Sequence, residues 1–165
     1  RPGQGIALRP HGKWEGKPMK DLLDNCKERS DLLPTLIEGQ ARYGHLPPDF
    51  LDGLAARLGV PVNDVYGVAS FYSFLSTVPL GRNAIWVCKC LPCHLKGGQQ
   101  VLEAIYAELG IRLGGVTADG IFSLHQTNCI GACDQAPAMM VNSDRYGQVT
   151  PAALKEILSR YQVKT

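Results

Sequence analysis

The 165-residue sequence lacks an apolar run of the roughly 18 residues that are needed to span a bilayer. The longest candidate, residues 65–79, is interrupted by a glycine and three serines. No run of five like charges occurs, and the formal net charge is +2, so electrostatic binding of nucleic acid is not expected. We therefore predict neither direct membrane insertion nor nucleic-acid binding.

Nucleotide-binding and nucleophilic motifs are also missing. Neither a G-x-G-x-x-G fingerprint nor a Walker loop is present, and the glycine pairs at 97–98 and 114–115 do not have the required spacing. The sequence contains no motif that pairs a catalytic nucleophile with a general base. The chain is therefore not expected to bind NAD or flavin itself.

No secretory signal pattern is found at the N-terminus. An apolar fraction of 45% is enough for a core without disulfides. The six cysteines therefore favour a reducing compartment and a metal or catalytic role over disulfide bonds. We expect a cytoplasmic location, with the mitochondrial matrix as an alternative if a leader has been removed.

The first half of the chain has the periodicity of helices. Residues 1–17, rich in proline and glycine, are predicted to form an extended arm. Four stretches within residues 18–79 have apolar residues at helical spacing, so a small helical bundle is predicted. Asp31 is expected to cap the second helix, while Gly44 and Gly59 end the second and third. Cys26 falls on the apolar stripe of the first helix and is expected to be a buried small hydrophobe.

The pattern changes in residues 80–165. Short apolar runs at 84–87, 121–124 and 138–141 predict three strands, with one helix after the first strand and another after the third. Tyr146 is expected to be a turn residue before the last helix. The predicted fold class is α+β, with an N-terminal helical bundle followed by a small α/β domain over one sheet.

Five of the six cysteines lie in two short segments, CKCLPC and NCIGAC. Each segment follows a predicted strand, so four thiols can converge if these two strands are neighbours. The spacings are C-x4-C from Cys88 to Cys93 and C-x3-C from Cys129 to Cys133. Four thiolates suit zinc or an iron–sulfur cluster, and a two-iron cluster would take one pair from each segment.

Two further interpretations stay open on these spacings. Cys90 and Cys93 form a C-x-x-C at a strand–helix junction, where thiol–disulfide oxidoreductases keep a nucleophile of lowered pKa. That interpretation leaves Cys88, Cys129 and Cys133 without a role. A structural zinc site is the other, although such sites more often use C-x2-C knuckles.

Glycines accompany both cysteine segments. Gly97 and Gly98 follow the first, and Gly131 lies inside the second. Because glycine has no side chain, these positions would let backbone N–H groups approach sulfur, and such hydrogen bonds tune a cluster. We therefore expect the three glycines to support a metal-binding site.

Three stretches carry a resemblance to a known family. Residues 87–98 (VCKCLPCHLKGG) and 119–151 (DGIFSLHQTNCIGACDQAPAMMVNSDRYGQVTP) resemble the thioredoxin-like 2Fe–2S subunit of NADH dehydrogenases. This is the 24-kilodalton-type subunit of respiratory complex I, with relatives in NAD-linked hydrogenases and formate dehydrogenases. Residues 41–75 (ARYGHLPPDFLDGLAARLGVPVNDVYGVASFYSFL) look like the helical domain of that family, so the resemblance covers about residues 18–161.

The resemblance implies a thioredoxin-like fold from about residue 80 onward. It also implies that one 2Fe–2S cluster is bound by Cys88, Cys93, Cys129 and Cys133. Cys90 departs from the family pattern, which usually has a small non-ligand residue there, and we expect a spare thiol.

The same resemblance implies an electron-transfer subunit that is not itself catalytic, within an NAD(P)H-linked oxidoreductase complex. The implied partner is a flavoprotein subunit that carries FMN, the NADH site and a 4Fe–4S cluster, together with further iron–sulfur subunits. FMN and NAD are thus expected only in the partner.

Overall fold

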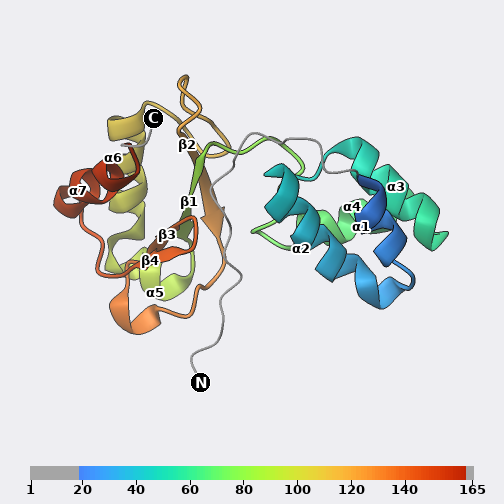
Figure 1. Ribbon diagram of the computed structural model, residues 1–165. Helices are drawn as coiled ribbons and strands as arrows, with labels where there is room; N and C mark the ends of the chain where they lie inside the picture. Colours follow the sequence, from blue (N-terminus) through green and yellow to red (C-terminus); the bar gives the residue numbers. More distant parts are fainter. Residues whose placement is uncertain (1–18, 163–165) are drawn as a thin grey trace. The chain divides into compact units, whose positions relative to one another are not determined.

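The computed structural model describes residues 19–162 (Figure 1). Within them the chain separates into two compact units, with the division between Leu80 and Gly81. We call them the helical unit and the sheet unit. Together they have the α+β fold class that the sequence predicts. Residues 1–17, for which the sequence predicts an extended arm, lie outside the described residues.

Within residues 19–80, helices and loops make up the whole helical unit. The helices are α1 (Met19–Asn25), the short 3-10 helix η1 (Arg29–Asp31), α2 (Leu32–Tyr43), α3 (Pro48–Leu58) and α4 (Val62–Phe71). Gly44 and Gly59 follow α2 and α3 in the left-handed conformation, with φ of 76° and 62°. Both helix ends are therefore where the sequence predicts them, because glycine adopts this conformation without a steric penalty.

The core of the helical unit is built from leucines around Phe50. Cys26 is fully buried in it, as its position on the apolar stripe predicts. Gly39 of α2 lies directly beneath the Phe50 ring, since a Cβ atom at residue 39 would lie 2.4 Å from Cε1 of Phe50. The packing of α2 against α3 therefore depends on a glycine in the middle of a helix, where glycine is otherwise unfavourable.

The prediction that the Asp31 side chain caps α2 is wrong. Asp31 Oδ2 instead accepts hydrogen bonds from the backbone N–H groups of Lys27 (2.8 Å) and Glu28 (3.0 Å). The bond from the Glu28 N–H group belongs to a capping box that starts η1, one short turn earlier in the chain. A three-residue helix has no apolar periodicity, so the spacing of hydrophobic residues could not reveal it.

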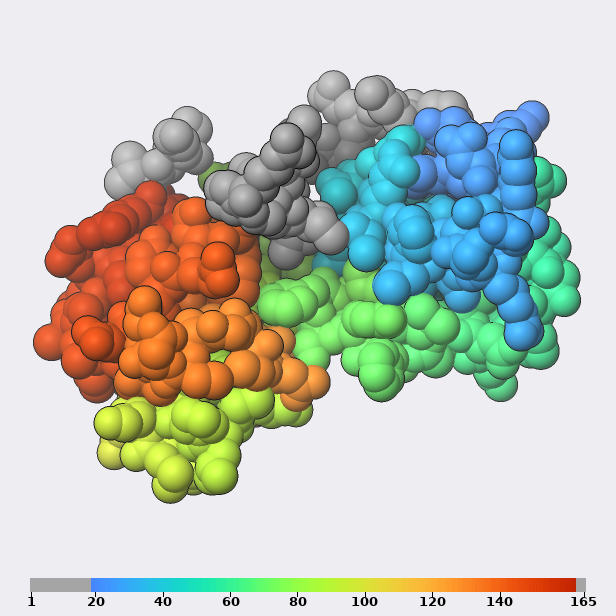
Figure 2. Space-filling model, turned by 90° about the horizontal axis from the view of Figure 1, so that it is seen from below, coloured from blue at the N-terminus to red at the C-terminus, as the bar shows by residue number. Residues whose placement is uncertain are grey.

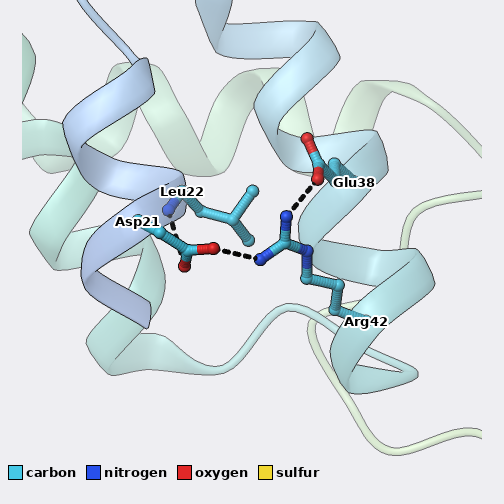
Figure 3. A network of polar contacts seen from close by, with 4 residues as sticks. All are labelled: Asp21, Leu22, Glu38 and Arg42. Carbon is cyan, nitrogen blue, oxygen red and sulfur yellow. Dashed lines mark hydrogen bonds and ion pairs between the residues drawn. The ribbon is translucent and has the colours of Figure 1, made fainter. Parts of the chain in front are cut away.

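Arg42 connects α2 to α1 on the surface of the helical unit (Figure 3). Its guanidinium donates to Asp21 Oδ2 at 2.8 Å and also to Glu38, one turn earlier in α2. The hydrogen bond from Arg42 holds the pKa of Asp21 below its usual value. Because these side chains are partly exposed, the network orients α1 more than it stabilises the fold.

A pair of glycine-to-alanine substitutions tests the packing of Gly39. Gly67→Ala lies within α4 with open space around the new methyl group, so it should raise the free energy of unfolding by about 0.5–1 kcal/mol. Gly39→Ala gains the same helix propensity but forces the Phe50 ring aside, which costs about 1–3 kcal/mol. Urea denaturation of both variants should therefore give opposite or clearly separated shifts, and equal stabilisation would contradict the packing described.

The sheet unit contains four strands among its described residues, in the order β2-β1-β3-β4. They are β1 (Asn83–Cys88), β2 (Phe122–Thr127), β3 (Met139–Val141) and β4 (Asp144–Tyr146). β1 and β2 are parallel, whereas β3 is antiparallel to both β1 and β4. The sheet is therefore mixed, with β1 as a fully buried inner strand.

Two long helices cover one face of this sheet (Figure 1). They are α6 (Gln99–Leu109) and α7 (Pro151–Gln162), and the apolar residues of both pack on Ile85, Leu124 and Met139 in one core. Before α6 come the short α5 (Leu91–Cys93) and the π-helical turn η2 (His94–Gly98), while η3 (Cys133–Gln135) precedes β3. Within residues 19–162, no helix is both long and apolar enough to cross a membrane.

The three predicted strands and the two long helices of the sheet unit are confirmed, whereas β4 was not predicted. Tyr146, which the sequence suggested to be a turn residue, lies in β4 and pairs with Met139. Its phenol also bonds to that of Tyr161 in α7, at 2.7 Å. The strand escaped prediction because it is a short edge strand with two exposed charged residues, Asp144 and Arg145.

Candidate metal centre

The parallel pairing of β1 with β2 brings the two cysteine segments together. Cys88, the last residue of β1, is in register with Thr127, the last residue of β2. Beyond the strands, the Lys89 N–H group donates to the Thr127 carbonyl at 3.0 Å. Cys129 follows two residues later, so both segments leave the sheet at one edge. The neighbouring strands that the sequence analysis assumed are thus present.

The first segment turns directly from strand into helix. Cys90 occupies the N-cap position of α5 in an extended conformation, and Pro92 lies in the first turn, where its missing N–H group costs no hydrogen bond. The His94 N–H group then donates to the Cys90 carbonyl at 2.9 Å. Cys93 is buried in this turn, as is Cys88 at the end of β1, whereas Cys90 is partly exposed. The strand–helix junction predicted at Cys90 and Cys93 is present, but the spacing did not reveal that Cys93 ends the first helical turn.

Gly97 and Gly98 let the chain pass close behind the first segment. Gly97 has a φ of 100°, which few other residues tolerate. A Cβ atom on Gly98 would lie 2.8 Å from the carbonyl oxygen of Cys93 and 3.7 Å from that of Cys88. The sequence predicts that a backbone N–H group at Gly98 approaches sulfur. In the structure, the backbone of Gly98 instead lies against carbonyl groups of the cysteine segment.

The second segment forms a tight turn around a sulfur atom. The Gly131 N–H group donates to Cys129 Sγ at 3.4 Å, which is the backbone-to-sulfur contact that the sequence predicts. Gly131 is left-handed, with a φ of 76°. The Sγ atoms of Cys129 and Cys133 lie 3.4 Å apart, and both residues are exposed. Two thiolates bound at about 2.3 Å to one tetrahedral metal lie about 3.8 Å apart, so this separation suits two ligands of one metal.

The pKa values of the thiols show that the two segments influence one another. Burial, followed by the hydrogen bond with the neighbouring Cys88, raises the pKa of Cys93 to about 11. The pKa of Cys133 is raised first by its contact with Cys129 and also by the charge of Cys88, in the other segment. Cys88 and Cys93 also share a small apolar cluster with Ala138. The two cysteine segments therefore lie close together, and the assignment of the four cysteines as ligands stays a prediction.

Cys90 lies within the same group of thiols. Burial raises the pKa of Cys90, followed by the effects of Cys88 and Cys129. A redox-active C-x-x-C needs a nucleophile of lowered pKa, whereas both Cys90 and Cys93 have raised values. The thiol–disulfide interpretation is therefore disfavoured by the environment of its two cysteines.

The described residues do not form a site for a single metal ion. Within residues 19–162, no group of three or more His, Cys, Asp or Glu side chains is arranged to hold one metal ion. The donor set consists instead of two thiol pairs, one buried and one exposed. A two-iron cluster takes two thiolates on each iron, so this donor chemistry fits a 2Fe–2S cluster.

The two exposed cysteines should differ in reactivity when no metal is bound. The Gly131 N–H group, followed by Cys133, lowers the pKa of Cys129, whereas the pKa of Cys133 is raised. Because the thiolate is the nucleophile, Cys129 should react first with iodoacetamide at pH 7–8. Peptide mass spectrometry across pH should place the Cys129 transition at a lower pH than the Cys133 transition. Faster labelling of Cys133 would contradict the described turn.

Comparison with known proteins gives matches over most of the chain. The sequence model of the family described as thioredoxin-like [2Fe-2S] ferredoxin matches residues 19–162. A subunit of the NADH-quinone oxidoreductase of Aquifex aeolicus (strain VF5) is 42% identical over 135 residues, which cover 82% of this chain and 84% of that protein. The HndA subunit of the NADP-reducing hydrogenase of Solidesulfovibrio fructosivorans is 39% identical over 135 residues, or 82% of this chain and 79% of that protein.

A solved structure shows the same fold. The crystal structure of an NAD+-reducing [NiFe]-hydrogenase in the air-oxidized state aligns with 80% of this chain at a TM-score of 0.67 and 26% identity. This chain spans about a quarter of the hydrogenase chain that it matches, 23% of its length. The similarity therefore concerns one part of that larger chain.

Proposed function

The chain belongs to the thioredoxin-like [2Fe-2S] ferredoxin family, and we propose that it is the electron-transfer subunit of an NAD(P)H-linked oxidoreductase complex. Its cofactor is a single 2Fe–2S cluster, in keeping with a family described as thioredoxin-like [2Fe-2S] ferredoxin. When bound, such a cluster accepts and releases one electron at a time. The chain itself carries out no other chemistry in this proposal.

The observation that carries the proposal is the pairing of thiols at the shared edge of β1 and β2. We infer that Cys88 and Cys93 supply the buried pair of ligands, and that Cys129 and Cys133 supply the exposed pair. Cys90 is the spare thiol beside them. The relatives support the proposed function, because they are named as parts of oxidoreductases that act on NADH, NADP or NAD+.

The protein residues have three tasks in this proposal. The buried pair, Cys88 and Cys93, anchors the site to the sheet and keeps water away from its inner side. The exposed pair leaves the outer side open to another protein. The Gly131 N–H group donates to the Cys129 sulfur, which stabilises negative charge there and so affects the reduction potential.

The proposed partner is a flavoprotein subunit that carries FMN, the NADH site and a 4Fe–4S cluster, with further iron–sulfur subunits in the same complex. We also propose that residues 18–79 and 80–165 are separate domains, and that the helical one contributes to assembly. We infer a cytoplasmic location, or the mitochondrial matrix, because a site of four unpaired thiols requires a reducing compartment.

Electron exchange with the flavoprotein subunit tests this function. The iron-loaded chain should keep its visible absorption when NADH is added alone, because it has no nucleotide-binding motif. Addition of a catalytic amount of the purified flavoprotein subunit should then bleach that absorption as the cluster is reduced. Bleaching by NADH without the partner, or no bleaching with it, would contradict the proposed function.

A further inference from the structure

Two leucines beside the thiol group are unusually exposed. Leu91 is 67% exposed and Leu95 is 73% exposed, although both follow closely on the buried strand β1. They lie one helical turn apart, at positions i and i+4, so both project from the same side of the α5–η2 segment. Pro92, between them, is exposed as well. A single exposed leucine needs no explanation, but such a group beside a functional site indicates a contact surface.

Basic side chains flank these leucines. From residue 82 to residue 102 the sequence contains no aspartate or glutamate, while Lys89 and Lys96 are both exposed. Neither lysine forms an ion pair with any of the described residues 19–162. Across the site, Asp134 is the exposed acidic residue of the second segment. The first segment is therefore an apolar surface with a positive rim.

This surface adjoins the exposed thiols. Cys90 directly precedes Leu91, and it packs against the apolar cluster of Cys88, Cys93 and Ala138, which Ile130 and Ala132 of the second segment also contact. Figure 2 shows the yellow-green segment, which follows β1, projecting from the sheet unit beside the orange segment that contains Cys129 and Cys133. A protein that covers Leu91 would thus also approach the open side of the thiol group.

We propose that Leu91 and Leu95, with Lys89 and Lys96 at their rim, form the docking surface for the redox partner, and that the partner presents an apolar socket bordered by carboxylates. This proposal rests on the proposed function, and it adds the chemistry of the partner's surface. The lysines steer an acidic partner toward the thiol group, because opposite charges accelerate association. The leucines then exclude water from the contact and slow dissociation.

Two double variants separate these contributions. Lys89→Glu with Lys96→Glu reverses the rim, so association with the purified flavoprotein subunit should slow about tenfold at about 20 mM salt. That difference should shrink at about 300 mM salt, because exposed charges are screened. Leu91→Ser with Leu95→Ser removes the apolar anchors, so the Kd should rise about tenfold through faster dissociation, with the salt dependence unchanged.

Matched controls come from elsewhere in the sheet unit. Leu113→Ser changes a leucine that is 41% exposed, and Lys155→Glu reverses a lysine whose side chain is 76% exposed. Neither control should change binding. All variants should keep the wild-type visible spectrum and its bleaching by dithionite, which shows that the site itself is intact.

The possible results are distinguishable. If wild type binds the flavoprotein subunit and both double variants bind equally well, the docking surface is wrong while the proposed function stands. Equal weakening by Leu113→Ser or Lys155→Glu would also overturn the docking surface. If iron-loaded wild type does not bind the flavoprotein subunit, the proposed partner fails, and the docking proposal fails with it.

Discussion

The parallel pairing of β1 with β2 is the constraint on which the rest of the sheet unit depends. It sets Cys88 against Thr127, so that two chain segments about 40 residues apart leave the sheet at the same edge. A shift of register would separate the thiols along the strand direction, because each residue advances a strand by about 3.3 Å. The hydrophobic core beneath the sheet therefore fixes the geometry of the metal centre as well as the fold.

The two thiol pairs differ in environment, so that one side of the site is buried and the other is exposed. Cys88 and Cys93 are held by a strand end and a helical turn, with the backbone of Gly98 packed behind them. Cys129 and Cys133 lie in an exposed turn, where one N–H group already points at sulfur. In the proposed function, electrons would therefore enter and leave on the side of the exposed pair.

Much of this architecture could be predicted from sequence, because long helices and buried strands carry their periodicity in apolar residues. The strands that precede the two cysteine segments likewise pair as neighbours, as the sequence analysis assumed. The local turns could not be predicted. Asp31 caps a 3-10 turn that has no hydrophobic pattern. Tyr146 belongs to an edge strand whose other two residues, Asp144 and Arg145, are charged. The burial of Cys93 by a helical turn, and the exposure of Leu91, arise from tertiary packing that spacing does not encode.

The central claim is that four particular cysteines hold one 2Fe–2S cluster. The most direct test is to measure iron, acid-labile sulfide and the EPR spectrum of the dithionite-reduced protein, for wild type and for single cysteine-to-serine variants. Wild type should contain about two irons and two sulfides per chain and give an S = 1/2 signal. Substitution at 88, 93, 129 or 133 should remove or strongly alter the signal, whereas Cys90→Ser and Cys26→Ser should keep it. An iron-free wild type, or loss of the cluster in Cys90→Ser, would contradict the account.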